Sequence, residues 1–271
     1  MPMRHVPLLV LAAGQRCGST LVQRLLTSHP EVLIWGEHDG QVDRVLEAGE
    51  GLLAWSADAG HIAREEFERH AYQGWMANLI PDTDRILDSL RRFVEALYAE
   101  PAAALGRPIW GFKEVRYGPS EVRRLHRLFP DLAVILLVRD PRDVLRSLDE
   151  WERWSRGIWT RERTKLTVEH WQRLARSFLP GTAFDPVPVL RLRYEDVVND
   201  PALTCEIVGK HTGLDPHAFD RAVFAKRVHV EEPIARFGRD LREWEGLPDS
   251  LRQLLAPPEL RRIANAWGYD I

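Results

Sequence analysis

The stretch that most constrains this chain covers residues 8–37. It begins with six consecutive apolar residues, 8–13, a run too short to span a membrane and typical of a strand buried on both faces. Gly14 and Gly18 then bracket a three-residue loop, and we expect a helix to open at Ser19. Such a loop collects backbone N–H groups at the positive end of a helix dipole, and glycine allows close approach of the backbone. The stretch therefore predicts an anion-binding site.

The composition is that of an ordinary globular protein, with 45% hydrophobic and 28% charged residues among 271. A net charge of −3 gives no global reason to expect nucleic acid or an anionic membrane as a partner, and we expect neither. Cys17 and Cys205 are too few for a disulfide framework and indicate a reducing compartment. We see no signal peptide or membrane anchor before Gly14, so the expected location is cytoplasmic.

Apolar strands alternate with helical patterns along most of the chain. A second short strand is expected just before Glu37, and later strands are expected at 108–113, 133–138 and 187–194. The alternation predicts an α/β fold, with a single domain over residues 1–271 and a mainly parallel central sheet flanked by helices.

The segment from 38 to 105 is helical in pattern and contains no phosphate-binding signature. Its clearest apolar stripe, with a 3.6-residue period, runs from Ile86 to Leu97 after a predicted cap at Asp82. We interpret the segment as a helical insertion over the sheet, with the stripe as part of the core. We also expect this insertion to shape a substrate pocket.

The loop after the first strand differs from the G-x-x-x-x-G-K-[ST] motif of nucleotide-binding proteins. Only three residues separate Gly14 from Gly18, no lysine follows Gly18, and the cation Arg16 lies inside the loop. The pattern keeps a phosphate-cradling geometry without the residues that hold Mg²⁺. No H-x-x-x-H, C-x-x-C or carboxylate cluster suggests a metal site, so we expect no metal.

A second polar cluster follows the strand at 133–138. Asp140 can cap a helix that starts at Pro141. By i, i+3/i+4 spacing, Ser147 would share a helix face with Asp140 and look back towards Arg139. A guanidinium and a hydroxyl converging in this way predict a second anion site, separate from the first. A structural salt bridge is the alternative role for Arg139.

Together, the pattern R-x-G-S-T-L at 16–21 and the pattern R-D-P-R-x-x-x-x-S at 139–147 resemble the two cofactor motifs of the sulfotransferases that use 3′-phosphoadenosine 5′-phosphosulfate (PAPS). The sequence is most similar to bacterial and Golgi-type members, including tyrosylprotein and carbohydrate sulfotransferases. RYEDVVNDP at 193–201 and WGY at 267–269 continue the match, so the motifs span nearly the whole chain in order. The resemblance implies a P-loop-like sulfotransferase fold, with 3′-phosphoadenosine 5′-phosphate (PAP) as product.

The resemblance also assigns cofactor-binding residues. The loop residues would hold the 5′-phosphosulfate, the pair after the later strand would hold the 3′-phosphate, and a tyrosine would approach the adenine, with strand-end packing as its alternative role. A late basic loop resembles the family's pattern only loosely. The loop residues are Arg16, Cys17, Gly18, Ser19 and Thr20, and the pair is Arg139 and Ser147. The tyrosine is Tyr194, and the late basic loop contains Arg236 and Gly238.

Three further assignments concern catalysis. Lys113 resembles the family lysine that stabilises the leaving phosphate oxygen, and Arg16 would help to stabilise the same oxygen. The catalytic histidine of cytosolic members would fall at Val115, which cannot accept a proton. Glu37 matches the glutamate base of tyrosylprotein and several carbohydrate enzymes, with the adjacent His38 as the reserve candidate.

The expected function is transfer of a sulfuryl group from PAPS to a hydroxyl or amine on a small-molecule, carbohydrate or peptide acceptor. Two alternatives stay open. A P-loop-like nucleotide kinase would need an Mg²⁺-binding carboxylate, for which Asp140 is a candidate. A non-catalytic PAP-binding module of the same fold is the other. The acceptor and the oligomeric state are not predicted.

Overall fold

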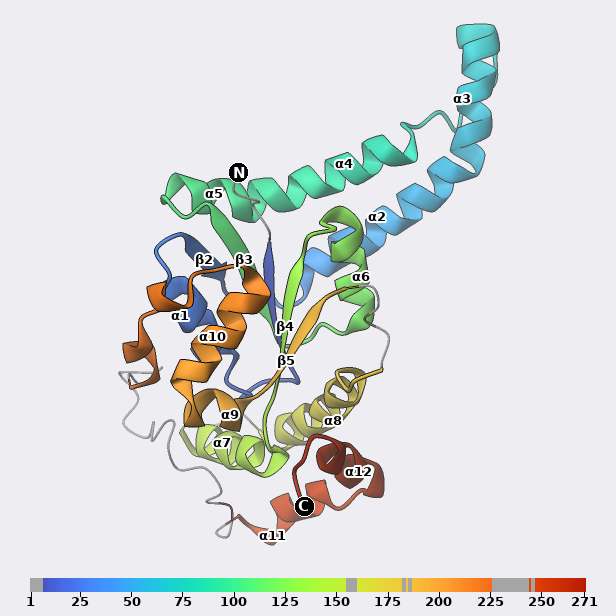
Figure 1. Ribbon diagram of the computed structural model, residues 1–271. Helices are drawn as coiled ribbons and strands as arrows, with labels where there is room; N and C mark the ends of the chain where they lie inside the picture. Colours follow the sequence, from blue (N-terminus) through green and yellow to red (C-terminus); the bar gives the residue numbers. More distant parts are fainter. Residues whose placement is uncertain (1–6, 155–159, 182–183, 185–186, 226–243, 245–246) are drawn as a thin grey trace.

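The computed structural model describes residues 7–154, 160–181, 184, 187–225, 244 and 247–271. A five-stranded sheet with the order β2-β3-β1-β4-β5 forms its centre, and all four strand pairs are parallel (Figure 1). The strands are β1 (Leu8–Ala12), β2 (Val32–Trp35), β3 (Ile109–Glu114), β4 (Ala133–Val138) and β5 (Val189–Arg193).

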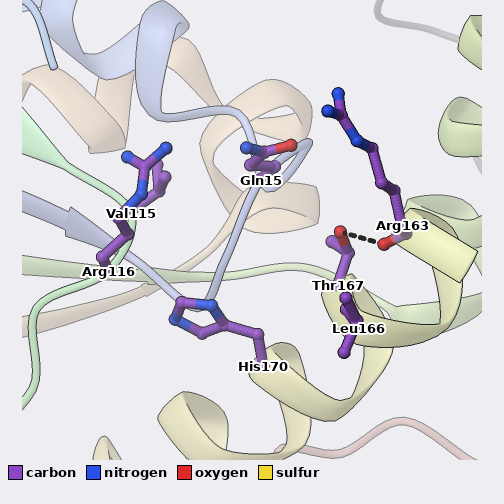
Figure 2. Close-up of a pocket in the computed structure, with 7 residues that line it drawn as sticks. All are labelled: Gln15, Val115, Arg116, Arg163, Leu166, Thr167 and His170. Carbon is purple, nitrogen blue, oxygen red and sulfur yellow. Dashed lines mark hydrogen bonds between the residues drawn. The ribbon is translucent and has the colours of Figure 1, made fainter. Parts of the chain in front are cut away.

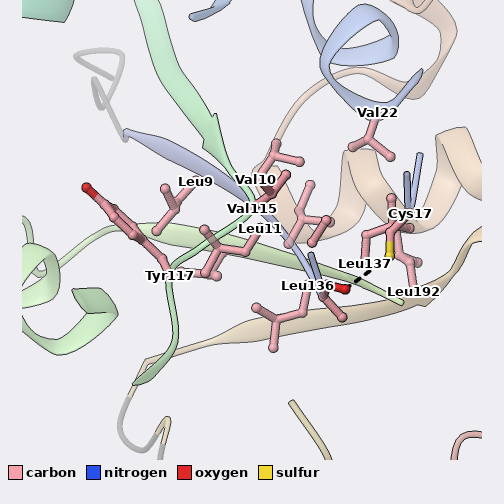
Figure 3. Packing of buried hydrophobic residues seen from close by; sticks show 14 of the residues in the cluster. Leu9, Val10, Leu11, Cys17, Val22, Val115, Tyr117, Leu136, Leu137 and Leu192 are labelled. Atoms are coloured by element: carbon pink, nitrogen blue, oxygen red, sulfur yellow. Dashed lines mark hydrogen bonds between the residues drawn. The ribbon is translucent and has the colours of Figure 1, made fainter. Parts of the chain in front are cut away.

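The two most apolar runs of the sequence form adjacent central strands. β1 pairs with β4 from Leu8 opposite Ala133 to Ala12 opposite Leu137, and every residue of both strands is buried. Figure 3 shows side chains of this buried cluster on either side of the strands. Continuous apolar strands need cover on both faces. The predicted α/β fold with a parallel sheet is confirmed.

Helices supply that cover. In Figure 1, α1 and α10 lie on one side of the strands, and α6 and α8 lie on the other. The α-helices are α1 (Ser19–Ser28), α2 (Gln41–Ala57), α3 (Ala59–His70), α4 (Thr83–Val94), α5 (Glu100–Ala104), α6 (Pro119–Leu128), α7 (Pro141–Trp154), α8 (Arg161–Ser177), α9 (Tyr194–Asn199), α10 (Pro201–Thr212), α11 (Asp249–Arg252) and α12 (Pro258–Ala266). None of those within the described ranges is long and apolar enough to cross a membrane.

Helix starts follow the predicted capping residues. The Asp82 side chain accepts from the backbone N–H of Arg85 at 2.8 Å at the start of α4. The Asp140 side chain accepts from the N–H of Arg142 at 2.9 Å where α7 begins. A carboxylate in this position satisfies a backbone donor that has no intrahelical partner. The cap predictions at both residues are confirmed.

Residues 41–104 are mainly helical. In Figure 1, α2 and α4 run side by side away from the sheet, and α3 forms the far end of this projection, which we call the arm. A short 3-10 turn, η1 (Ala71–Gln73), follows α3, and a π-helical turn, η2 (Glu95–Ala99), joins α4 to α5. The projecting shape leaves many arm side chains without cover.

The expectation that the apolar stripe of 86–97 is core was only partly right. Ile86 and Val94 are buried, but Phe93 is 40% and Leu97 is 44% exposed. The wider π turn after Val94 explains why Leu97 is exposed, since it places Tyr98 on the buried face in place of Leu97. Phe93 remains exposed because the arm extends beyond the sheet it was expected to cover.

The carboxyl ends of the five strands meet at one edge of the sheet. Parallel pairing makes this inevitable, and ligands of such sheets bind at this edge. Of the described residues that the sequence predicted for the site, Lys113 lies near the end of β3, and the others follow β1, β2, β4 or β5.

Candidate active site

The loop after β1 adopts the conformation expected of a phosphate-cradling turn. Gly14 and Gly18 have φ angles of 86° and 91°, and Arg16 between them also lies in the left-handed region at 65°. A non-glycine residue at positive φ is uncommon and costs conformational energy. Gly18 is the N-cap of α1, so the open end of that helix faces the carboxyl edge of the sheet.

A cavity of about 390 Å³ opens over this loop. Most of its polar lining residues come from the two predicted motifs. The lining residues are Gln15, Arg16, Gly18, Ser19, Thr20, Leu21, Glu37, Val115, Arg139, Ser147, Leu148, Trp151 and Tyr194. All five strand ends therefore contribute to one cavity, with α1 and α7 closing it.

The two predicted anion sites are joined, which corrects the expectation that they are separate. The Nε of Arg16 donates to the Oγ of Ser147 at 2.9 Å, and the guanidinium of Arg139 donates to the carbonyl oxygen of Arg16 at 3.1 Å. The reason is the strand order, since β1 and β4 are neighbours and their loops meet. Because the Ser147 oxygen accepts from Arg16, its own hydrogen can be donated to a ligand.

Tyr194 packs directly on the loop. The Arg139 guanidinium lies 4.4 Å above the centre of the Tyr194 ring. A Cβ atom at Gly18 would come within 2.2 Å of the same ring. Glycine is therefore required at this position for two reasons, its positive φ and the closeness of the ring. Tyr194 is buried and lines the cavity floor, a position that suits both of the roles predicted for it.

Cys17 points away from the cavity. Its side chain is fully buried in the core, and its Sγ donates to the carbonyl oxygen of Ala13 at 3.2 Å (Figure 3). Burial raises the pKa of this thiol to about 12. Only the backbone of Cys17 is in a position to serve an anion at the loop.

Glu37 follows β2 and faces the cavity between two cations. Its Oε1 accepts from the Nζ of Lys113 at 2.5 Å, and its Oε2 accepts from Arg116 at 3.2 Å. Lys113 is buried, whereas the Glu37 side chain is 31% exposed. The carboxylate and the ammonium that the sequence assigned to catalysis are therefore in direct contact.

His38 lies apart from the cavity. Its ring packs against Tyr98, Phe112 and Tyr117, and its Nδ1 is 3.6 Å from a carboxylate oxygen of Glu114. Burial lowers the pKa of His38 below its usual value. Of Glu37 and His38, only Glu37 lines the cavity.

Sequence reasoning assigned no role to Arg116 and Trp151. Arg116 pairs with Glu114 at 2.7 Å and Asp39 at 3.0 Å as well as with Glu37. Trp151 lines the cavity, and its ring lies 5.2 Å below the Arg16 guanidinium. The spacing of Trp151 four residues after Ser147, on one helix face, was the available signal.

Glu195 holds the strand ends in place beneath the cavity. Its Oε1 accepts from the backbone N–H of Asp140 at 2.9 Å, and its Oε2 accepts from the hydroxyl of Tyr269 at 2.8 Å. Burial raises the pKa of Glu195, against the effect of these hydrogen bonds. The network links the end of β4 to α9 and to the C-terminal segment.

Arg236 and Gly238 lie outside the described residues. Among the residues that the structure does describe, no group of three or more His, Cys, Asp or Glu side chains could hold a metal ion.

A buried parallel strand that feeds a glycine-bracketed loop into a helix defines an α/β protein of the phosphate-binding-loop class. The family model described as the sulfotransferase family matches residues 7–218, so the chain belongs to the sulfotransferase family. The resemblance stated from the motifs is confirmed at this level.

Solved structures agree with this assignment. The sulfotransferase domain from the curacin biosynthetic pathway shares 15% identity, over 98% of this chain and 99% of that domain, with a TM-score of 0.53. The sulfotransferase domain from the Synechococcus PCC 7002 olefin synthase shares 19% identity, over 100% of this chain and 98% of that domain, with a TM-score of 0.52. Identities this low show a common fold. No curated protein sequence matches the chain.

Proposed function

We propose that this protein transfers the sulfuryl group of PAPS to a hydroxyl or amine of a small-molecule, carbohydrate or peptide acceptor. The observation that supports this most directly is the convergence of three elements on one cavity. The loop after β1, the Arg139 and Ser147 pair after β4, and Glu37 after β2 all line it.

The donor set of the cavity fits a nucleotide with phosphate groups at both ends. Arg16 and Arg139 supply charge, while Ser19, Thr20 and Ser147 supply hydroxyl groups. Glu37 is the sole carboxylate among the described residues that line the cavity, and it accepts a hydrogen bond from Lys113. In this proposal, Arg139 and Ser147 hold the 3′-phosphate and the β1–α1 loop holds the phosphosulfate.

The chemistry follows from these positions. Glu37 takes the proton of the acceptor, the acceptor oxygen or nitrogen forms a bond to sulfur, and the bond from sulfur to the bridging phosphate oxygen breaks. Lys113 and Arg16 stabilise the charge that develops on the departing PAP. Since Lys113 contacts Oε1 of Glu37 before reaction, it must shift towards the leaving oxygen as that carboxylate oxygen accepts the proton.

The structure argues against the kinase alternative at one residue. Both carboxylate oxygens of Asp140 are bonded to Arg142, at 3.0 Å and 2.7 Å, and one also caps α7. An aspartate so occupied is poorly placed to hold Mg²⁺. A non-catalytic module would have no need for the ion pair of Lys113 with Glu37 at the cavity edge.

The test is transfer of label to a panel of sugars, phenols, steroids, peptides and lipids, from radiolabelled PAPS and separately from γ-labelled ATP. We expect label from PAPS and none from ATP. Transfer from ATP would support the kinase alternative. Binding of PAP without transfer to any acceptor would support the binding module.

A further inference from the structure

A second cavity of about 250 Å³ lies beside the first, at the face of α8 (Figure 2). Gln15 and Val115 line both cavities, so the two adjoin at these residues. Arg116 lines the second cavity and also donates to Oε2 of Glu37 at 3.2 Å. A molecule in this cavity would therefore lie next to the proposed base.

The lining of the second cavity is cationic. Arg116 and Arg163 contribute guanidinium groups, and no carboxylate is among the described residues that line it. Arg116 also pairs with Glu37, Glu114 and Asp39. Arg163 extends from the first turns of α8 on the opposite side of the cavity from Arg116 (Figure 2).

His170 adds a neutral donor to this lining. Its Nε2 lies 3.1 Å from the NH2 group of Arg173. A guanidinium can only donate, so Nε2 accepts and the hydrogen of the neutral ring is on Nδ1. Burial, with Arg173 and Arg116 nearby, lowers the pKa of His170 to about 4. At neutral pH the ring is therefore uncharged.

Apolar surface completes the cavity. Leu166 is 54% exposed although it lines the cavity, and Val115 is buried at the junction with the first cavity. Outside residues 41–105, Leu166 is one of two large hydrophobic side chains that are exposed among the described residues. An exposed leucine beside two arginines suits a ligand with an apolar body and an anionic end.

We infer that the second cavity is the acceptor site and that the acceptor carries an oxyanion, such as a carboxylate, which Arg163 binds while the acceptor hydroxyl reaches Glu37. This inference rests on the proposed function. It narrows the acceptor to a small hydroxylated anion whose two polar ends are separated by a short apolar segment.

The experiment compares matched acceptors that differ only in this charge. The probes are 4-hydroxyphenylacetate and 6-hydroxyhexanoate, each paired with its neutral carboxamide. We measure kcat/KM for transfer, and by calorimetry the affinity of each probe for the protein with and without saturating PAP. A charge-assisted contact predicts that the carboxylates are favoured over the amides by about tenfold or more in both measurements.

Two variants test the assignment to Arg163. Arg163→Gln should remove the preference, mainly by raising KM for the carboxylates towards the value for the amides. Arg176→Gln makes the same charge change on α8 about 20 Å further along the helix and should keep the preference. Equal affinity of the wild-type protein for carboxylates and amides, or no binding of the carboxylates, would overturn the inference. So would an unchanged preference in Arg163→Gln. Failure of the proposed function would show separately, as absence of PAP binding or as absence of transfer from PAPS to any acceptor of the wider panel.

Discussion

At the residue scale, the contact of Glu37 with Lys113 and Arg116 leads to the first prediction. Glu37→Gln keeps the shape of the side chain but cannot take the acceptor's proton. General-base catalysis supplies about 10²–10⁴ in rate, so kcat should fall by that order while PAP affinity stays nearly unchanged. Steady-state kinetics and calorimetry on the same preparation check both parts. Near wild-type turnover in Glu37→Gln, with none in His38→Ala, would move the base to His38.

The second residue-scale prediction concerns the loop glycines. Gly14 and Gly18 have similar positive φ angles, so alanine should cost each a similar strain of about 1–2 kcal/mol. Only at Gly18 would the new Cβ meet the Tyr194 ring, since at Gly14 the nearest atom is 3.7 Å away. Gly18→Ala should therefore weaken PAP binding by about tenfold, and Gly14→Ala by little. Equal PAP affinities of these two variants would show that the ring contact does not matter.

Much of the site was predictable residue by residue. Arg16, Arg139 and Ser147 lie in short motifs whose spacing fixes their place at a loop or a helix start, and the structure brings all three to one cavity. Arg116 was not predictable, because its importance comes from contacts with Glu37 and Asp39 that are 79 and 77 positions away in the chain. The buried state of the Cys17 side chain likewise depends on the strands around it.

At the element scale, α7 carries Ser147 to the cavity and depends on Asp140 at its start. Asp140→Ala should lower the free energy of unfolding by about 1 kcal/mol and Tm by about 2–4 °C. It should also weaken PAP binding, because the first turns of α7 position Ser147. Differential scanning calorimetry and PAP titration measure the two effects.

Asp200→Ala is the matched control for this prediction. Asp200 caps α10 by accepting from the N–H of Leu203 at 2.9 Å, and no residue of α10 lines the cavity. The stability loss should be similar, with PAP affinity unchanged. An Asp140→Ala variant that binds PAP as the wild type does would contradict a positioning role for the cap.

The elements differ in how far the sequence determines them. The capping residues and the apolar runs are local signals, and they predicted α4, α7, β1 and β4. The exposure of Leu97 depends on a π turn, for which the sequence has no periodic signal. The projection of the arm depends on where α2 and α4 leave the sheet, which is a property of the whole fold.

At the scale of the whole molecule, Glu195 joins β4, α9 and the C-terminal Tyr269. Its pKa is raised above the ordinary 4.5. Between pH 4.5 and the pKa in the folded state, the folded protein therefore binds more protons than the unfolded chain. Its contribution to stability is thus fully present below about pH 4.5 and is lost as pH rises through the folded-state pKa. Glu195→Gln can keep both hydrogen bonds, because the amide can donate to the Tyr269 oxygen.

We therefore expect Glu195→Gln to gain stability relative to the wild type as the pH rises above about 4.5. Urea unfolding at several pH values up to 8 measures this difference. Glu195→Ala, which leaves the Asp140 N–H without its partner, should be destabilised at every pH. A constant difference between Glu195→Gln and the wild type across pH would show that Glu195 does not titrate differently in the two states.

The sequence predicted a parallel sheet, but it did not predict the order of the strands. Each strand was recognisable from its apolar run, but the placement of β1 between β3 and β4 is decided by packing across the whole sheet. That placement makes the loops after β1 and β4 neighbours, and so turns two predicted anion sites into one cavity.

The measurement that tests the central claim most directly is calorimetric titration of the wild-type protein with PAP and with AMP, which lacks the 3′-phosphate. Charged hydrogen bonds from Arg139 and Ser147 contribute about 1.5–3 kcal/mol each, so PAP should bind at least about tenfold more tightly than AMP. Equal affinities for PAP and AMP would contradict the assignment of this cavity to a 3′-phosphorylated nucleotide.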